Sequence, residues 1–286
     1  VLGERRQRGG LEDMKSHRRC LSVAGSDPSG GAGLQADLKT FSALGCYGMT
    51  AVVAVVDENT VGVTGVHPVP VDFVTGQIRS CLDDIGADAI KIGMLHSAEL
   101  ILAVRDTLRE YPVGDIVLDP VMVATSGDPL LREDAIATLR DELIPHARII
   151  TPNIPEAEIL LGRSLSANDE LPEAARQLSQ GGKVSVFLKA GHLDGDSLTD
   201  ILYDAETDTI HRMESPRIDT VNTHGTGCTL SSAITSYLAL RHPLPEACRL
   251  AKDYISAAIR DGAGYLIGHG HGPVNHFHSL WPKETF

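Results

Sequence analysis

Residues 20–44 read CLSVAGSDPSGGAGLQADLKTFSAL, and this stretch indicates the class of fold. The apolar run from Leu21 to Ala24 has the length of a buried strand, and a glycine-rich loop follows it. From Gln35 to Leu44 the spacing becomes that of a helix, with Leu38 and Phe41 on one face. A strand, a loop and a helix in this order form a βα unit, so we expect a parallel sheet.

The alternation of strands and helices continues along the chain. Further strands are expected at Val52–Val56, Ala89–Gly93, Ile116–Asp119, Arg148–Thr151 and Val184–Lys189, with a hairpin from Leu198–Tyr203 and Thr209–Met213. Helices are expected at Pro70–Asp84, where Phe73, Gln77, Ile78 and Cys81 share helical spacing, and near Thr226–Arg241 and Pro245–Gly262. The pattern predicts an α/β fold whose mostly parallel sheet is covered on both faces. We interpret residues 18–286 as a single domain and residues 1–17 as a disordered or non-native extension.

Composition restricts the function classes. The chain carries 38 acidic and 25 basic side chains, a net charge of −13, which disfavours nucleic acid and anionic membranes as partners. No run approaches the ~18 apolar residues that a membrane span needs. The five cysteines form no C-x-x-C pair, which argues against a disulfide framework or a zinc site and is typical of a reducing compartment. We therefore expect a cytoplasmic protein.

The strongest local motif is NTHGTGC at residues 222–228, directly before a helical run. Glycines allow successive backbone N–H groups to point one way, and the helix start adds its positive dipole. Gly225, Thr226 and Gly227 are therefore candidates for an anion hole, and the alternative is an ordinary helix cap. Cys228 lies in the first helical turn, where the dipole is expected to favour a thiolate that could act as a base, although a buried structural cysteine is the simpler interpretation.

Polar side chains end several of the expected strands. Asp119 and Glu156, which follow two successive strands, are suited to holding a water-coordinated Mg²⁺, and Lys189 could supply positive charge to ATP phosphates. Each could instead be a turn, cap or solvated residue. In the first loop, Gly25 allows close approach of a ligand, and Asp37, one helical turn beyond the loop, could either bind a ligand or cap.

The histidines near the C-terminus suggest a metal at first sight. Residues 268–278 read GHGHGPVNHFH. The glycines and Pro273 preclude a rigid helical set of ligands, so a structural zinc site is disfavoured.

Seven strings occur together in one order: AGSDPSGGAGLQADLKTF at 24–41, KIGML at 91–95, DPVMVATSGD at 119–128, TPNIPEA at 151–157, KAGHL at 189–193, NTHGTGCTLS at 222–231 and GPVNHFH at 272–278. In this combination the chain resembles the hydroxymethylpyrimidine phosphate kinases of thiamine biosynthesis, over about Leu21 to Trp281. Any one string is weak, but seven in register are specific.

The resemblance implies a ribokinase-like three-layer αβα sandwich, usually a homodimer. It implies transfer of the ATP γ-phosphoryl group to 4-amino-5-hydroxymethyl-2-methylpyrimidine and to its monophosphate. By the same resemblance, Gly225 to Cys228 form the anion hole and Cys228 stands where many relatives have a catalytic aspartate. Asp119 and Glu156 organise Mg²⁺ and Lys189 the ATP phosphates. The residues expected to bind the pyrimidine are Gly25, Asp37, Glu58, Met94 and Val121.

Two positions depart from the family pattern. The family commonly has A-Q-N-T where this chain has Asp57-Glu58-Asn59-Thr60, so Glu58 replaces a glutamine that faces the pyrimidine. A lysine often present in the D-P-V-M loop is Thr125 here.

Two other functions remain as alternatives. One is a pyridoxal or pyridoxine kinase of the same family, although a dual-function form is expected to carry an extra cysteine where this chain has Ala124. The other is a non-catalytic sensor of thiamine precursors, which the intact Asp119, Lys189 and Cys228 disfavour.

Overall fold

The computed structural model describes residues 16–122, 131, 133–191 and 197–282. Within them a nine-stranded sheet has the order β3-β2-β1-β4-β5-β6-β7-β8-β9. The strands are β1 Arg19–Gly25, β2 Tyr47–Glu58, β3 Val63–Pro68, β4 Ala89–Ile92, β5 Ile116–Leu118, β6 Ile149–Ile150, β7 Ser185–Leu188, β8 Ser197–Asp204 and β9 Thr209–Pro216. Strands β2, β1, β4, β5, β6 and β7 run parallel, whereas β3, β8 and β9 add antiparallel pairs at the two edges.

Helices connect the strands and cover the sheet. They are α1 Gly33–Ala43, α2 Val71–Asp84, α3 Ala98–Leu108, α4 Glu133–Thr138, α5 Ile154–Leu161, α6 Leu171–Leu178, α7 Thr226–Ala239 and α8 Leu244–Gly262, with a π-helical turn η1 Leu139–Leu143 and a 3-10 turn η2 Ile144–His146. The expected α/β fold with a mostly parallel sheet is confirmed. No helix among the described residues combines the length and apolar character needed to cross a membrane.

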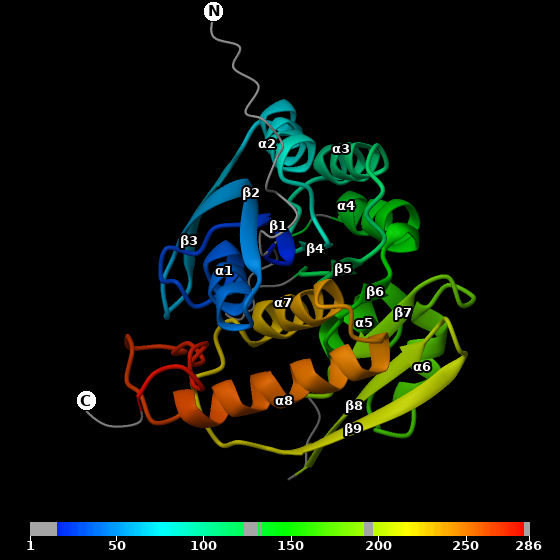
Figure 1. Cartoon of the computed structure of the whole chain (residues 1–286). Coiled ribbons are helices and arrows are strands. Elements are labelled where there is room, and N and C mark those ends of the chain that lie inside the picture. The colour runs from blue at the N-terminus through cyan, green and yellow to red at the C-terminus, as the bar shows by residue number, and fades with distance from the viewer. Residues whose placement is uncertain (1–15, 123–130, 132, 192–196, 283–286) are drawn as a thin grey trace, which may run out of the picture.

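Two hydrophobic cores lie on opposite faces of the sheet. Helices α2 to α6 pack over one face in the larger core, while α7 and α8 pack side by side over the other, as Figure 1 shows. Helix α1 lies against α7, where Phe41 and Ala239 share a small buried cluster. The three layers leave the carboxyl ends of the parallel strands open to a cavity.

The buried face of α2 differs from the sequence prediction. Ile78 is buried as predicted and Cys81 packs partly buried against the core, but Phe73 is 65% exposed and the helix buries Val74 and Leu82 instead. Val74 and Ile78 are four residues apart, as are Phe73 and Gln77, so both pairs have helical spacing. The structure buries the first pair, one position along from the second. Gln77 has a role of its own: its side chain amide pairs with both the N–H and the carbonyl of Val52.

Most of residues 1–17 and the segment with Ala124 and Thr125 lie outside the described residues. The assignment of an N-terminal extension before a single domain therefore stays a prediction. The five cysteines are all within the described part of the chain, and all are free thiols there.

Candidate active site

A cavity of about 620 Å³ opens at the carboxyl ends of the parallel strands. Such an edge is where open α/β sheets bind their ligands. The predicted site residues that line the cavity are Gly25, Glu58, Met94, Asp119, Val121, Glu156, Lys189, Gly225, Thr226, Gly227 and Cys228. Of the predicted set, Asp37 alone is absent from the wall. Residues from both ends of the sequence thus meet at one site.

The predicted anion-hole loop, residues 222–228, has a shape that only glycine tolerates at its turn. Gly225 has a φ of 79° and precedes the first residue of α7. A Cβ at this position would lie 1.8 Å from the carbonyl oxygen of Gly31. The loop and the first βα loop are therefore in backbone contact. The start of α7 faces the cavity, where its dipole favours an anion.

Cys228 differs from the prediction in its ionisation. Burial raises the pKa of its thiol to about 11, against the lowering effect of the Lys91 ammonium, and the carboxylates of Asp37 and Asp119 add to the rise. The expected thiolate is therefore wrong for the resting site, since the helix dipole does not offset desolvation. Cys228 still lines the cavity, together with Gly225, Thr226 and Gly227 of the same loop.

Asp119, Glu156 and Lys189 form one buried group at the ends of β5, β6 and β7. Lys189 Nζ lies 3.1 Å from Asp119 Oδ1 and 4.0 Å from Glu156 Oε2. Burial raises the pKa of Glu156 to about 7, with Lys189 opposing and Asp119 adding to the rise. For Asp119, burial alone would raise the pKa, but the Lys189 and Lys91 ammonium groups bring it below its usual value.

Glu156 also performs the capping role that was its simpler interpretation. Its carboxylate accepts the N–H of Asn153, and Asn153 Oδ1 accepts the N–H of Glu156, which makes a capping box at the start of α5. The cap fixes the carboxylate at the cavity wall. When Glu156 is ionised, it and Asp119 are two hard oxygen donors beside one ammonium, with one net negative charge, which fits a Mg²⁺ held partly through water.

Asp37 does not lie where the sequence placed it. Its carboxylate is fully buried and accepts hydrogen bonds from Lys91 Nζ at 2.9 Å, Ser22 Oγ at 2.5 Å and Ser232 Oγ at 2.6 Å. The expected contact between Asp37 and a ligand is not supported, because all three partners are internal. Asp37 instead holds Lys91, which does line the cavity and which sequence reasoning missed.

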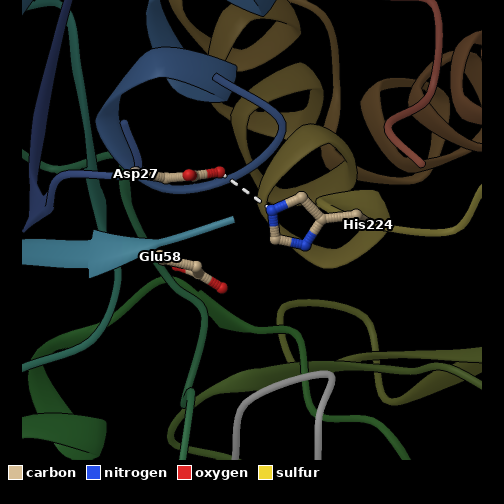
Figure 2. Close-up of side chains that lie close together, drawn as sticks. All are labelled: Asp27, Glu58 and His224. Carbon is tan, nitrogen blue, oxygen red and sulfur yellow. Dashed lines mark hydrogen bonds and ion pairs between the residues drawn. The ribbon is translucent and has the colours of Figure 1, made fainter. Parts of the chain in front are cut away.

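A second group, missed in part, consists of Asp27, Glu58 and His224. Figure 2 shows the three side chains converging from the first loop, the end of β2 and the anion-hole loop. Their ligand atoms lie within 4.8 Å of one another, and His224 Nε2 is 2.9 Å from Asp27 Oδ2. Asp27 and His224 each lie in one of the sequence strings quoted above, which is the only sign of them in the sequence. Their spacing along the chain does not predict that they form a pair.

The charges of this group depend on each other. Burial raises the pKa of Asp27, yet hydrogen bonds from His224, Ser29 and Ala32 outweigh it and hold the pKa well below its usual range. Burial lowers the pKa of His224, but Asp27 and Glu58 raise it overall. Burial and the Asp27 charge raise the pKa of Glu58, with His224 opposing. Of the two carboxyl groups in this cluster, Glu58 is therefore the one whose pKa is raised.

The fold and the cavity together have the features of a small-molecule kinase. The family described as phosphomethylpyrimidine kinase matches residues 27–275. A hydroxymethylpyrimidine/phosphomethylpyrimidine kinase of Rhizobium meliloti is 48% identical over 91% of this chain and 97% of its own length. The enzyme of the same name from Escherichia coli is 45% identical over 91% of this chain and 98% of its own. The chain belongs to the phosphomethylpyrimidine kinase family.

Solved structures give the fold. A phosphomethylpyrimidine kinase from Clostridium difficile has a TM-score of 0.75 and 43% identity, covering 85% of this chain and 99% of its own. A pyridoxal kinase from Bacillus subtilis, solved as an ADP complex, has a TM-score of 0.84 and 39% identity, covering 91% and 98%. The fold is ribokinase-like, as the resemblance implied. Both kinds of kinase share it, so the fold alone does not choose the substrate.

Proposed function

We propose that this protein transfers the γ-phosphoryl group of ATP to 4-amino-5-hydroxymethyl-2-methylpyrimidine and to its monophosphate. The family match over residues 27–275 and the named activity of the relatives support this assignment. The observation that carries it is the meeting in one cavity of the anion-hole loop, Cys228, the Asp119–Lys189 pair and the Glu58 cluster. As a kinase, the protein is a phosphotransferase.

The wall of the cavity divides by chemistry. One part is lined by Gly25, Val56, Glu58 and Met94, which combine apolar contacts with one titratable group. Another part is lined by apolar, polar and charged residues of β8, β9 and α8, among them Leu198, Ile259 and Lys252, whose ammonium pairs with Asp200. We assign the first part to the pyrimidine and the second to the nucleotide. The anion-hole loop with Cys228 lines the same cavity, as do Lys91 and Asp119. The cavity is large enough for two small-molecule substrates.

The residues of the site have separate tasks in the transfer. The thiolate of Cys228, formed when its thiol loses a proton to solvent, accepts the proton of the substrate hydroxyl, and the N–H groups at the start of α7 stabilise charge on the phosphoryl oxygens. Lys189 lies near this loop, since a Cβ on Gly227 would be 3.3 Å from Lys189 Nζ. Asp119 and Glu156 would hold Mg²⁺, which supplies charge neutralisation to the phosphates. The predicted homodimer and the cytoplasmic location belong to the same proposal.

The activity test is direct. Purified protein is expected to release ADP when given ATP and hydroxymethylpyrimidine in the presence of Mg²⁺, and to stop when EDTA is added. The reason is that carboxylates cannot neutralise the negative charge of the triphosphate. Mg²⁺ supplies the positive charge that this neutralisation needs. Unchanged ADP release in excess EDTA would contradict the roles of Asp119 and Glu156 as metal residues.

Glu58 gives a prediction about pH. An ionised carboxylate only accepts hydrogen bonds, whereas glutamine also donates. The aminopyrimidine edge presents an amino donor beside a ring-nitrogen acceptor, so Glu58 matches it when the carboxyl group or the ring nitrogen is protonated. The raised pKa of Glu58 keeps the protonated form available at higher pH, and that form is lost as pH rises through this pKa.

We therefore expect Glu58→Gln to preserve or improve kcat/KM for hydroxymethylpyrimidine, with a gain over the native protein that grows as pH rises through the pKa of Glu58. The measurement compares kcat/KM of the two proteins from pH 6 to pH 9. The ratio of the two proteins at each pH removes the contribution of other titrating groups. Parallel profiles would mean that Glu58 does not contact the substrate. A large loss in the variant, with a gain on another heterocycle, would mean that the natural substrate is not this pyrimidine.

A further inference from the structure

The chain after α8 contacts the turn that follows Glu58. In this segment His269 N and Gly270 N each donate to Thr60 Oγ1 at 3.2 Å, and His271 N donates to the Thr60 carbonyl at 2.8 Å. Figure 1 shows the red C-terminal segment beside the ends of β2 and β3. We define residues 268–275 as the C-terminal strap. Three of its amides thus converge on one residue.

The glycines of the strap are explained by close approach. A Cβ on Gly270 would lie 2.0 Å from the Thr60 carbonyl oxygen, and one on Gly272 would lie 2.2 Å from Asn222 Oδ1. Neither distance is compatible with a real side chain, so only glycine lets the strap lie in both places. The side chains of His269 and His271 are exposed, and it is the backbone of the strap that makes the contacts to Thr60.

The other end of the strap is attached to the anion-hole loop and to α8. The carbonyl of Gly272 accepts the N–H of His224 at 3.0 Å, and Pro273 pairs with His224 as a parallel bridge. Asn275 N donates to the Ala258 carbonyl at 3.1 Å, and Asn275 Nδ2 donates to Asp261 at 2.7 Å. The strap is therefore fixed to a long packed helix on one side and reaches Thr60 on the other.

The C-terminal strap connects the Glu58 wall of the cavity to the His224 wall without lining the cavity itself. Glu58 lies two residues before Thr60, and His224 lies in the loop that the strap binds directly. None of the strap residues lines the cavity. We propose that the strap is a positioning element that sets the separation of Glu58 and His224, with Thr60 as its key contact. It thereby determines how well the pyrimidine end of the pocket is formed before substrate arrives.

The proposal makes the effect of Thr60 selective. The turn at Thr60 belongs to the Glu58 side of the cavity, whereas the nucleotide part is built from β8, β9 and α8. Loss of preorganisation at the Glu58 side weakens binding of the pyrimidine, because the substrate then has to order the turn. It leaves ATP binding unchanged. A strap that served only to stabilise the fold would affect both substrates alike.

The test compares Thr60→Ala with Thr60→Ser, because serine keeps the hydroxyl that accepts two amides and alanine removes it. We expect Thr60→Ala to raise KM for hydroxymethylpyrimidine about three- to ten-fold, the range for two modest hydrogen bonds, with KM for ATP within about two-fold. Thr60→Ser is expected to resemble the native protein. Gly270→Ala is expected to raise KM for hydroxymethylpyrimidine more than Thr60→Ala does. Gly264→Ala is its control, because a Cβ on Gly264 has no atom nearer than 3.7 Å.

A second measurement does not depend on the proposed function. In hydrogen exchange, amides of residues 57–64 and 268–272 are expected to exchange faster in Thr60→Ala and to be protected in Thr60→Ser. Native protection in Thr60→Ala, or equal changes in both KM values, would overturn the positioning role. If the native protein fails to phosphorylate the pyrimidine, the proposed function is wrong, and the exchange comparison still decides whether the strap orders the Glu58 turn.

Discussion

Cys228→Ala is expected to lower kcat about 10²-fold or more while KM for both substrates changes little, because a general base contributes in that range to the transition state. Cys228 lines the cavity together with Gly227 and Thr226. Removing a small side chain there leaves the apolar and carboxylate contacts to both substrates in place. Steady-state kinetics with saturating Mg²⁺ measures the two parameters separately.

Cys228→Asp provides the matched control. An aspartate is ionised at neutral pH, whereas a thiol with a pKa of about 11 is almost fully protonated there. The variant is therefore expected to recover part of the lost turnover and to show a weaker rise of kcat toward alkaline pH than the native protein. Near-native turnover in Cys228→Ala would mean that the cysteine is structural and that another group takes the proton.

Gly225→Ala is expected to reduce kcat by about 10²-fold or more, the scale seen when oxyanion-type donors are displaced. The Cβ would collide with the Gly31 carbonyl at 1.8 Å, and a backbone atom cannot rotate away as a side chain can. The loop must therefore shift, and its N–H groups shift with it. Kinetics and circular dichroism together separate a displaced loop from a failure to fold.

Gly162→Ala is the control for backbone strain. Gly162 has a φ of 68°, similar to the 79° of Gly225, but no atom lies within 4 Å of its added Cβ. It carries the cost of a left-handed alanine, roughly 1–2 kcal/mol, without the collision. We expect near-native turnover from this variant. Equal losses in the two variants would attribute the effect to strain alone and would remove the support for an anion hole at Gly225.

The sequence predicted the fold well where one local pattern repeats. Most strands of the parallel part are short apolar runs, so their positions followed from the pattern of residues, whereas β2 was predicted as Val52–Val56 and runs from Tyr47 to Glu58. The edge strand β3 was missed, because Val63–Pro68 is largely exposed and contains Gly65 and Pro68. The face of α2 was misplaced because two apolar residues, Phe73 and Val74, are adjacent, and only packing decides which is buried.

The site was predicted as a set of motifs but not as an arrangement. Glycine turns and strand-end carboxylates have local signatures, so Gly225, Asp119 and Lys189 could be found from the chain. The partner of a buried charge is set by tertiary packing, so the Lys91–Asp37 and His224–Asp27 pairs could not be. The raised pKa of Cys228 is likewise a consequence of burial, which opposes the helix dipole that the sequence does reveal.

We expect the protein to phosphorylate a hydroxymethylpyrimidine bound in this cavity. The most direct measurement is kcat/KM in an ATP-consumption assay against hydroxymethylpyrimidine, its monophosphate, pyridoxal and ribose, with each phosphorylated product identified by mass spectrometry. We predict turnover of both pyrimidines, a lower kcat/KM for pyridoxal and no product from ribose. Robust phosphorylation of pyridoxal or ribose without pyrimidine turnover would contradict the assignment of substrate while leaving the fold and the phosphoryl-transfer site intact.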